Sequence, residues 1–140
     1  MTAARVAACL FALTLASRAP CAGPFVAYRA DDDVTVYDVA TETHTNLTNH
    51  PSIDAAPSWS GDGRHIAFGS NRDGQPDIYT VDADGGAVRR RTNTARNEHS
   101  LAFSPNGRYI AYGLRDYLNH GAESADGLLV GDTARRSSYE

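Results

Sequence analysis

The chain has 140 residues, a formal net charge of −4 and 41% hydrophobic residues, which is the composition of an ordinary single globular domain. All 13 basic residues are arginines, so chemistry that requires a catalytic lysine, such as Schiff-base formation, is excluded. The 17 acidic residues outnumber the basic ones, which argues against a broad electropositive surface and predicts no nucleic-acid partner.

The first predicted element is a secretory signal peptide over residues 1–22. Arg5 supplies a positive start, and an apolar run of 11 residues, Val6–Ala16, is followed by small residues and a proline. The run is shorter than the roughly 20 residues that a membrane-spanning helix needs. We therefore expect an exported chain, periplasmic or secreted and not transmembrane. A buried N-terminal helix is the structural alternative.

Both cysteines, Cys9 and Cys21, precede residue 23. Cys21 also stands where a bacterial lipoprotein is acylated, but Arg18-Ala19-Pro20 before it departs from the Leu-Ala-Gly type of sequence that this reaction needs. Removal of residues 1–22 leaves 118 residues with 11 Arg, 17 acidic residues and a charge of −6. That product has no thiol, which excludes disulfides, thiolate metal sites and a cysteine nucleophile.

An internal repeat of 44 residues organises the chain after residue 23. Residues 33–69 align with 77–113 without a gap and are identical at ten of 37 positions. Phe25–Tyr28 matches His65–Phe68, and Asp126–Val130 matches Asp77–Val81. The identities include the pairs Asp33/Asp77, Thr48/Thr92, Ser60/Ser104, Gly63/Gly107 and Ala67/Ala111. This period lies in the range of a β-propeller blade, about 40–45 residues.

Each repeat is predicted to contain four short strands, which in the central repeat cover 56–60, 65–70, 77–82 and 87–92. Apolar and small residues alternate along them, as expected of strands packed between neighbouring sheets. Ser60-Gly61-Asp62-Gly63 and Ser104-Pro105-Asn106-Gly107 have the composition of type I turns that end in a left-handed glycine, and 82–86 closes a further hairpin. The predicted fold class is all-β.

Two motifs make the resemblance specific. Residues 56–68, Ala-Pro-Ser-Trp-Ser-Gly-Asp-Gly-Arg-His-Ile-Ala-Phe, are followed by 70–79, Ser-Asn-Arg-Asp-Gly-Gln-Pro-Asp-Ile-Tyr. Together they resemble the TolB-type β-propeller repeat, a periplasmic relative of the WD repeat, over about residues 25–140. Gly61 stands where that family usually has Pro. TolB itself, as the family is known, has an α/β domain between its signal peptide and its propeller, whereas this chain enters the propeller directly, so we do not expect it to be TolB proper.

The length predicts an incomplete propeller. Residues 23–140 accommodate about 2.5 to 3 four-stranded antiparallel blades, at approximately 23–53, 54–97 and 98–140. Closed propellers use about 4–8 blades, so an open stack leaves sheet faces and edges exposed. Three explanations remain: a fragment of a longer reading frame, a chain that self-associates, or a decayed gene.

The sequence predicts no catalytic, cofactor-binding or metal-ligating residues and leaves the binding residues open. Ser70 and Ser124 lack the spacing of a nucleophile elbow. None of the five histidines lies two or four residues from another; they are His44, His50, His65, His99 and His120. We expect loop or strand-surface positions for them, although a metal-binding pair brought together in space is the alternative.

We expect structural roles for the charged turns as well. The aspartates of 31–33, 73–77 and 82–84 lack the ligand spacing of an EF-hand, so we expect them to cap backbone amides. Arg89–Arg91 is interpreted as a solvated edge strand, with an anion site as the alternative. Asn46-Leu47-Thr48 is a formal glycosylation sequon, relevant only in a host that glycosylates secreted chains.

Four function hypotheses follow. The leading one is a non-catalytic scaffold of the cell envelope whose propeller loops bind a protein or peptide. The main alternative is the N-terminal propeller of a secreted prolyl-oligopeptidase-like hydrolase, which requires a catalytic domain that residues 1–140 do not contain. A metal-dependent propeller enzyme, such as a lyase of acidic sugar polymers, and a self-assembling structural module are the remaining two.

Overall fold

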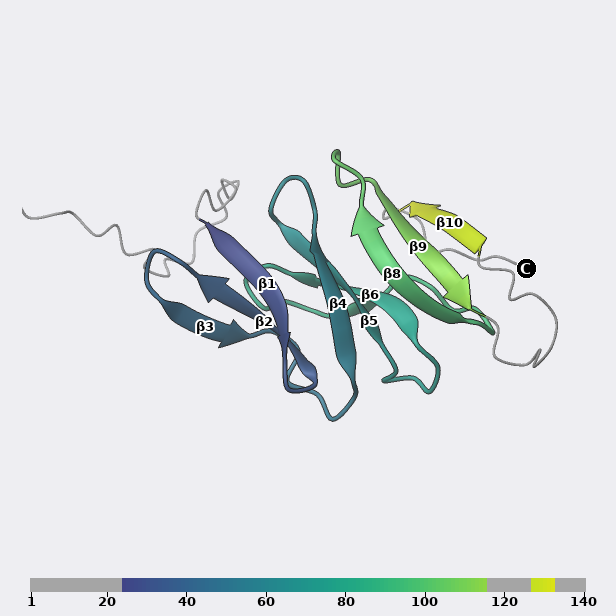
Figure 1. Cartoon of the computed structure of the whole chain (residues 1–140), viewed down its shortest axis with the longest axis horizontal. Coiled ribbons are helices and arrows are strands. Elements are labelled where there is room, and N and C mark those ends of the chain that lie inside the picture. The colour runs from purple at the N-terminus through teal and green to yellow at the C-terminus, as the bar shows by residue number, and fades with distance from the viewer. Residues whose placement is uncertain (1–23, 116–126, 133–140) are drawn as a thin grey trace, which may run out of the picture.

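A computed structural model describes residues 24–115 and 127–132 (Figure 1). The predicted signal peptide (1–22), residues 116–126 with His120 and Ser124, and the C-terminal residues 133–140 lie outside these ranges. The described residues form ten β-strands and no helix, so the all-β prediction is confirmed. No helix in these ranges is long and apolar enough to cross a membrane.

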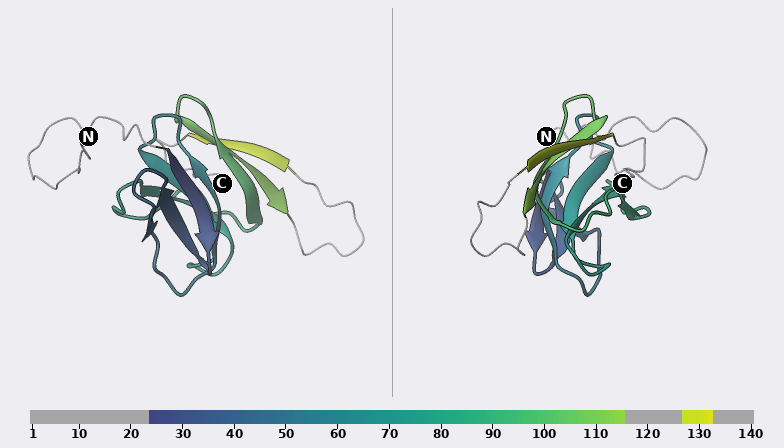
Figure 2. Two further views of the ribbon diagram at one scale, coloured as in Figure 1. Left: turned by 60° about the vertical axis from the view of Figure 1, so that its left-hand side comes forward. Right: turned by 90° about the vertical axis from the view of Figure 1, so that its right-hand side faces the viewer.

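The ten strands form three antiparallel sheets that lie side by side (Figures 1 and 2). The first contains β1 (Phe25–Ala30), β2 (Asp33–Asp38) and β3 (Thr43–Asn46) in that order. The second contains β4 (Asp54–Trp59), β5 (His65–Ser70), β6 (Asp77–Asp82) and β7 (Arg89–Arg90). The third is ordered β10 (Gly127–Asp132), β9 (Tyr109–Arg115) and β8 (Asn97–Phe103). The sheets do not close into a ring within the described residues.

The central sheet has the four strands that the sequence predicts, and β5 and β6 have the predicted bounds. The first strand of this sheet, β4, begins at Asp54 instead of Ala56, because Asp54 pairs with Ser70 ahead of a β-bulge. The last strand of this sheet, β7, is shorter than the predicted 87–92, since only Arg89 and Arg90 pair with β6. The first and third sheets contain three strands each within the described residues, and the blade limits at 53/54 and 97/98 stay a prediction.

Two equivalent hairpin turns join β4 to β5 in the second sheet and β8 to β9 in the third. Gly63 N donates to Ser60 O and Gly107 N donates to Ser104 O, both at 2.9 Å, which closes each four-residue turn. Gly63 has φ 67° and Gly107 has φ 68°, values that glycine adopts without steric cost. The predicted left-handed glycines are confirmed.

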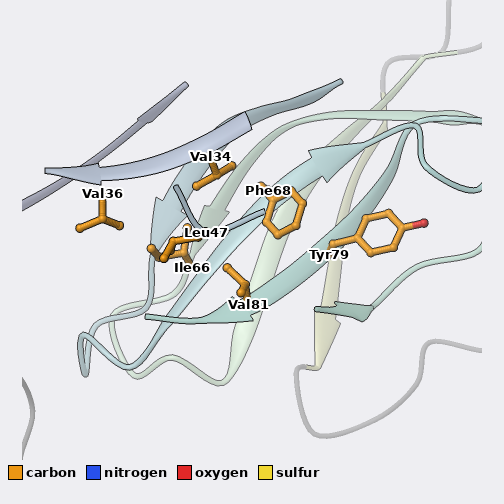
Figure 3. Close-up of a cluster of buried hydrophobic side chains, with 7 residues drawn as sticks. All are labelled: Val34, Val36, Leu47, Ile66, Phe68, Tyr79 and Val81. Atoms are coloured by element: carbon orange, nitrogen blue, oxygen red, sulfur yellow. The ribbon is translucent and has the colours of Figure 1, made fainter. Parts of the chain in front are cut away.

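The first hydrophobic cluster fills the space between the first and second sheets (Figure 3). Val34, Val36 and Leu47 come from the first repeat, and their partners come from β5 and β6 of the second sheet. These partners are Ile66, Phe68, Tyr79 and Val81, all nearly or fully buried. At about 25 cal/mol per Å² of buried apolar surface, this contact is a main source of stability for both sheets.

The second cluster joins the second sheet to the third. Ala67 and Ile78 point away from the first sheet and pack against Ile110, Tyr112 and Leu114. Successive residues of β5 therefore serve opposite interfaces, because side chains alternate across a strand. The alternation read from the sequence is confirmed: the central sheet is covered on both faces.

Candidate functional site

The two connections that pass from one sheet to the next, residues 47–53 and 91–96, lie at the same end of the sheets. Residues 47–53, 71–76 and 91–96 join successive strands at the lower end in Figure 1, together with the turn at 31–32. At the opposite end, residues 39–42, 60–64, 83–88 and 104–108 join successive strands within one sheet. Binding residues concentrate on surface loops that a rigid scaffold positions, so we take the lower end, where neighbouring sheets are connected, as the candidate binding surface and call it the loop face.

Hydrogen bonds donated by backbone amides hold neighbouring connections of the loop face together. Asp54 N donates to Asp32 O at 2.8 Å, and Ile53 N donates to Asn71 Oδ1 at 2.8 Å. Glu98 N donates to Pro76 O at 3.1 Å. The loops of one sheet are thus fixed to the first strand of the next, and the loop face is a continuous surface across three sheets.

A buried polar cluster lies just inside the loop face, where the first sheet is connected to the second. Asp54, fully buried, accepts hydrogen bonds from Arg72 Nη2 at 2.9 Å and from Ser52 Oγ at 3.0 Å. Ser52 Oγ also contacts His50 Nδ1 at 2.8 Å and Ser70 Oγ at 3.3 Å, and Arg72 Nε donates to Ser70 Oγ at 3.0 Å. The cluster therefore satisfies a buried carboxylate with a guanidinium and hydroxyls, as such a charge requires.

The same cluster decides the role of the candidate nucleophile Ser70. Its side chain is 1% exposed, and its hydroxyl is already engaged by Arg72 and Ser52. A nucleophilic hydroxyl must reach a substrate carbonyl, which this position prevents. Ser70 is thus a structural residue here, while Ser124 lies outside the described residues.

A second buried polar cluster joins the second sheet to the third. Glu98, 3% exposed, accepts hydrogen bonds from Ile78 N at 3.1 Å, from Thr94 Oγ1 at 2.8 Å and from Thr92 Oγ1. Burial raises the pKa of Glu98 above its ordinary value, against the lowering effect of the threonine hydroxyls. Burial also raises the pKa of Asp77, which is paired with Arg90.

The aspartates of the turns are mostly engaged within the protein. Asp33 accepts hydrogen bonds from Asn46 Nδ2 at 2.7 Å, Thr48 Oγ1 at 3.0 Å and His50 N at 3.1 Å. The bond from Asn46 is the main cause that lowers the pKa of Asp33. Asp73 accepts from the Tyr79 hydroxyl at 2.6 Å. The capping interpretation fits Asp33, which accepts from the His50 amide, whereas Asp73 accepts from a side chain instead. The described residues contain no group of three or more side chains suited to a metal ion.

The histidines and the arginine run have local partners. His44 contacts Tyr28 Oη, His50 contacts Ser52, His65 contacts Asp82 and His99 contacts Ser100. Arg89 lies 3.6 Å from Asp82, Arg90 pairs with Asp77 and Asp73, and Arg91 donates to Thr80 Oγ1. Each of the four described histidines contacts a residue of another type, and Arg89 and Arg90 lie beside carboxylates. His120 lies outside the described residues.

The sequence analysis did not identify the residues whose side chains support the loop face from inside the protein: Ser52, Asp54, Arg72, Thr94 and Glu98. A signal was present, because Asp54 and Glu98 are acidic residues at equivalent positions of the 44-residue repeat. Identical Thr48 and Thr92 also share a role, since their hydroxyls accept from Val34 N at 3.1 Å and Ile78 N at 2.8 Å. A repeat at this spacing can identify such inter-sheet contacts when its polar positions are compared.

Above the buried clusters, the loop face presents small polar, charged and apolar groups together. Its exposed residues include Asp31, Asp32, Asn49, His50, Pro51, Ile53, Asp73, Gln75, Asn93 and Arg96. Ile53 is 48% exposed and is the largest apolar side chain among them. A surface that combines an exposed apolar residue with polar and charged residues suits contact with another protein more than it suits one kind of charged ligand.

Comparison with known proteins places this geometry in context. Residues 25–126 match the TolB beta propeller domain family. The Tol-Pal system protein TolB of Francisella tularensis subsp. mediasiatica is 32% identical over 105 residues, which cover 74% of this chain and 24% of that protein. The chain thus spans about a quarter of the length of this curated relative.

Solved structures agree with the family match. A putative TolB from Agrobacterium tumefaciens superposes with a TM-score of 0.67 and 27% identity, covering 78% of this chain and 41% of that one. The tricorn protease superposes with a TM-score of 0.58 at 20% identity, covering 80% of this chain and 11% of that one. This second likeness shows the fold alone.

Proposed function

The chain belongs to the TolB beta propeller domain family, and from that membership we propose that it is an exported, non-catalytic scaffold that binds a protein or peptide in the cell envelope. The observation that carries the proposal is the loop face. Its loops are fixed to one another by backbone hydrogen bonds and buried polar clusters, while their outer residues stay exposed. Such a surface binds a partner with little loss of loop entropy.

Two further observations support a protein partner and an envelope location. The related proteins are named for the Tol-Pal system, so a protein component of a system of that type is the partner class that we propose. The apolar run that begins at Val6 and the small residues after it support export to the periplasm.

The absence of catalysis is part of the proposal. Asp54, Ser70 and Glu98 are buried and hydrogen-bonded within the protein, and they act as positioning groups for the loops. The hydrolase alternative gains no support from the likeness to the tricorn protease, which concerns the fold only. If the purified chain hydrolyses model peptides and a control preparation without the chain does not, a purely binding role would be contradicted.

A pair of matched variants tests the loop face. The immobilised chain is incubated with periplasmic extract of its host, and bound proteins are identified by mass spectrometry. Ile53→Glu places a charge on the loop face, whereas Val39→Glu places one on an equally exposed valine (45%) at the opposite end. We expect one protein to be enriched on the parent and on Val39→Glu, with affinity for Ile53→Glu weakened about tenfold or more, equivalent to ~1.4 kcal/mol. Equal binding to both variants would show that the loop face is not the site.

A further inference from the structure

Glu98 fixes the connection of residues 91–96 from inside the protein. Its side chain is buried, and its two carboxylate oxygens have different partners. Oε2 accepts from Ile78 N at 3.1 Å and from Thr92 Oγ1, whereas Oε1 accepts from Thr94 Oγ1 at 2.8 Å. These partners come from β6 and from the connection itself. The carboxyl group of Glu98 therefore holds this part of the loop face on the second sheet.

The hydroxyl of Thr94 has more acceptors than protons. Besides Glu98 Oε1, the carbonyl oxygen of Arg96 lies within reach of Thr94 Oγ1, at 3.2 Å. The backbone amide of Arg96 donates to the same Oγ1, also at 3.2 Å. A hydroxyl carries one proton and two lone pairs. When Glu98 is ionised, Thr94 can thus donate to the carboxylate or to the Arg96 carbonyl, but not to both.

A proton on Glu98 removes this conflict. Protonated Oε1 donates to Thr94 Oγ1, which accepts a second hydrogen bond from the Arg96 amide and donates its own proton to the Arg96 carbonyl. Oε2 remains an acceptor for the Ile78 amide and the Thr92 hydroxyl. All of these hydrogen bonds can therefore form at the same time only when Glu98 carries a proton.

The surroundings of Glu98 favour that proton. Burial raises the pKa of Glu98 against the lowering effect of the threonine hydroxyls, and the neighbouring carboxylate of Asp77 on β6 raises it as well. Asp77 is fully buried and is paired with Arg90 on β7. Arg90 Nη1 also lies 3.7 Å from Asp73 Oδ2, in the connection of residues 71–76. The nearby guanidinium is thus already shared by two other carboxylates.

The other elements packed against β8 also carry titratable residues. On β9, Leu114 pairs with Glu98, and Tyr112 lies on the same side of that strand. On the second sheet, the titratable residues of β4 and β5 have partners of their own: Asp54 is paired with Arg72, and His65 contacts Asp82.

The repeat-equivalent residue of the second sheet shows what distinguishes Glu98. Asp54 occupies the same position of the 44-residue repeat and is also buried. It accepts from the guanidinium of Arg72 at 2.9 Å, whereas Glu98 accepts from hydroxyls and a backbone amide. A buried carboxylate that is paired with a cation keeps its charge more readily than one that is bonded to neutral donors. Of these two equivalent positions, Glu98 is the one suited to bind a proton.

We propose that Glu98 is a pH-sensitive switch for the 91–96 connection of the loop face. Uptake of a proton at Oε1 completes the hydrogen bonds of Thr94 and Arg96, and loss of that proton leaves the Arg96 carbonyl without its hydroxyl donor. The connection presents Asn93 and Arg96 to solvent, so protonation changes how firmly these residues are held. As a means of regulating binding, the switch rests on the proposed function, but its test needs no partner.

Nuclear magnetic resonance of the chain labelled with ¹³C and ¹⁵N, from about pH 4 to pH 8, tests the switch. We expect the carboxyl carbon of Glu98 and the carbonyl carbon of Arg96 to shift with one common midpoint above the ordinary 4.5. In Glu98→Gln, the amide nitrogen donates to Thr94 Oγ1 at every pH. The Arg96 carbonyl of this variant should therefore keep its low-pH position throughout.

Variants of Thr94 separate transmission through its hydroxyl from a purely structural role of Glu98. In Thr94→Val, Glu98 still titrates, but the Arg96 carbonyl loses its response. Thr94→Ser keeps the hydroxyl and restores the response. Glu42→Gln, on the exposed turn between β2 and β3, is the control and leaves both shifts unchanged. Circular dichroism verifies folding, and if Thr94→Val does not fold, the result for Glu98→Gln decides the question alone.

Three outcomes overturn the proposal. The first is an Arg96 carbonyl that does not titrate in the parent, and the second is one that still titrates in Glu98→Gln or in folded Thr94→Val. The third comes from Asp77→Asn, which removes a neighbouring negative charge and should only lower the midpoint of Glu98. If Asp77→Asn abolishes the response instead, Asp77 is the group that binds the proton. Because no partner is present, failure here leaves the proposed binding function standing, and failure of the pull-down leaves the switch standing.

Discussion

At the scale of single residues, Gly61 occupies a position where any side chain meets the neighbouring hairpin. A Cβ built at Gly61 lies 1.9 Å from the carbonyl oxygen of Pro105. This contact explains why the chain has glycine where the resembling repeat usually has proline. We expect Gly61→Ala to lower the free energy of unfolding by about 1–3 kcal/mol, since overpacking forces the backbone to shift.

Gly69→Ala is the matched control for that prediction. A Cβ at Gly69 meets only Ala55 O, at 3.8 Å, which is an ordinary contact. Urea denaturation of both variants measures the difference. An equal loss of stability in the two would contradict the proposed collision with Pro105.

Glu98 makes stability depend on pH. Its pKa is raised by burial above the ordinary value of 4.5, so the folded state holds this proton more tightly than the unfolded state. The corresponding stabilisation is complete below pH 4.5 and is lost as pH rises through the raised pKa. We expect Glu98→Gln to remove this loss, so that stability of the variant relative to the parent increases as pH rises.

Thermal unfolding between acidic and neutral pH measures this effect. Glu42→Gln, on the exposed turn between β2 and β3, is the control and should follow the parent at every pH. A Glu98→Gln difference that does not change with pH would indicate that the residue acts by packing alone.

At the scale of elements, β4 and β8, the first strands of the second and third sheets, each contain a strained β-bulge. Ala56 has φ 53° and the repeat-equivalent Ser100 has φ 52°, and each lies where the pairing register with the next strand shifts. Left-handed backbone costs a non-glycine residue roughly 1–2 kcal/mol. We therefore expect Ala56→Gly to raise the free energy of unfolding by up to about 1 kcal/mol, and Ala56→Val to lower it.

Ala102→Gly distinguishes relief of strain from a general effect of glycine. Ala102 lies exposed on β8 after the bulge and has no positive φ, so its replacement by glycine should cost about 0.5–1 kcal/mol. Chemical denaturation of the two glycine variants side by side should therefore give changes of opposite sign. Destabilisation by both would mean that the bulge at Ala56 is not strained.

At the scale of the whole molecule, position in the stack of sheets decides the energetic role of equivalent residues. Ile66 and Val26 occupy the same repeat position, but Ile66 is fully buried and Val26 is half exposed. We expect Ile66→Ala to cost about 2–5 kcal/mol, as core truncations do, and Val26→Ala to cost under about 1 kcal/mol. Denaturation at a concentration where the chain is monomeric makes the comparison, and similar costs would show that Val26 is buried in the monomer.

The sequence by itself determined the local structure. The 44-residue spacing, the alternation in β5 and β6, and the turns ending at Gly63 and Gly107 predicted the strands and hairpins, because strand pairing and turn geometry depend on nearby residues. The family followed from the same motifs. The limits of the outer strand did not, since β7 depends on pairing with β6 and not on its own composition.

Tertiary structure decided which residues hold the loop face together and which faces stay uncovered. Arg72 reaches Asp54 across 18 residues, and Glu98 binds the backbone of Ile78 from another sheet. No periodicity encodes such contacts, because they arise only when neighbouring sheets are stacked and a buried carboxylate must find a donor. Likewise, Val26 and Ile66 are equivalent in the repeat, and within the described residues it is Ile66 that a neighbouring sheet covers.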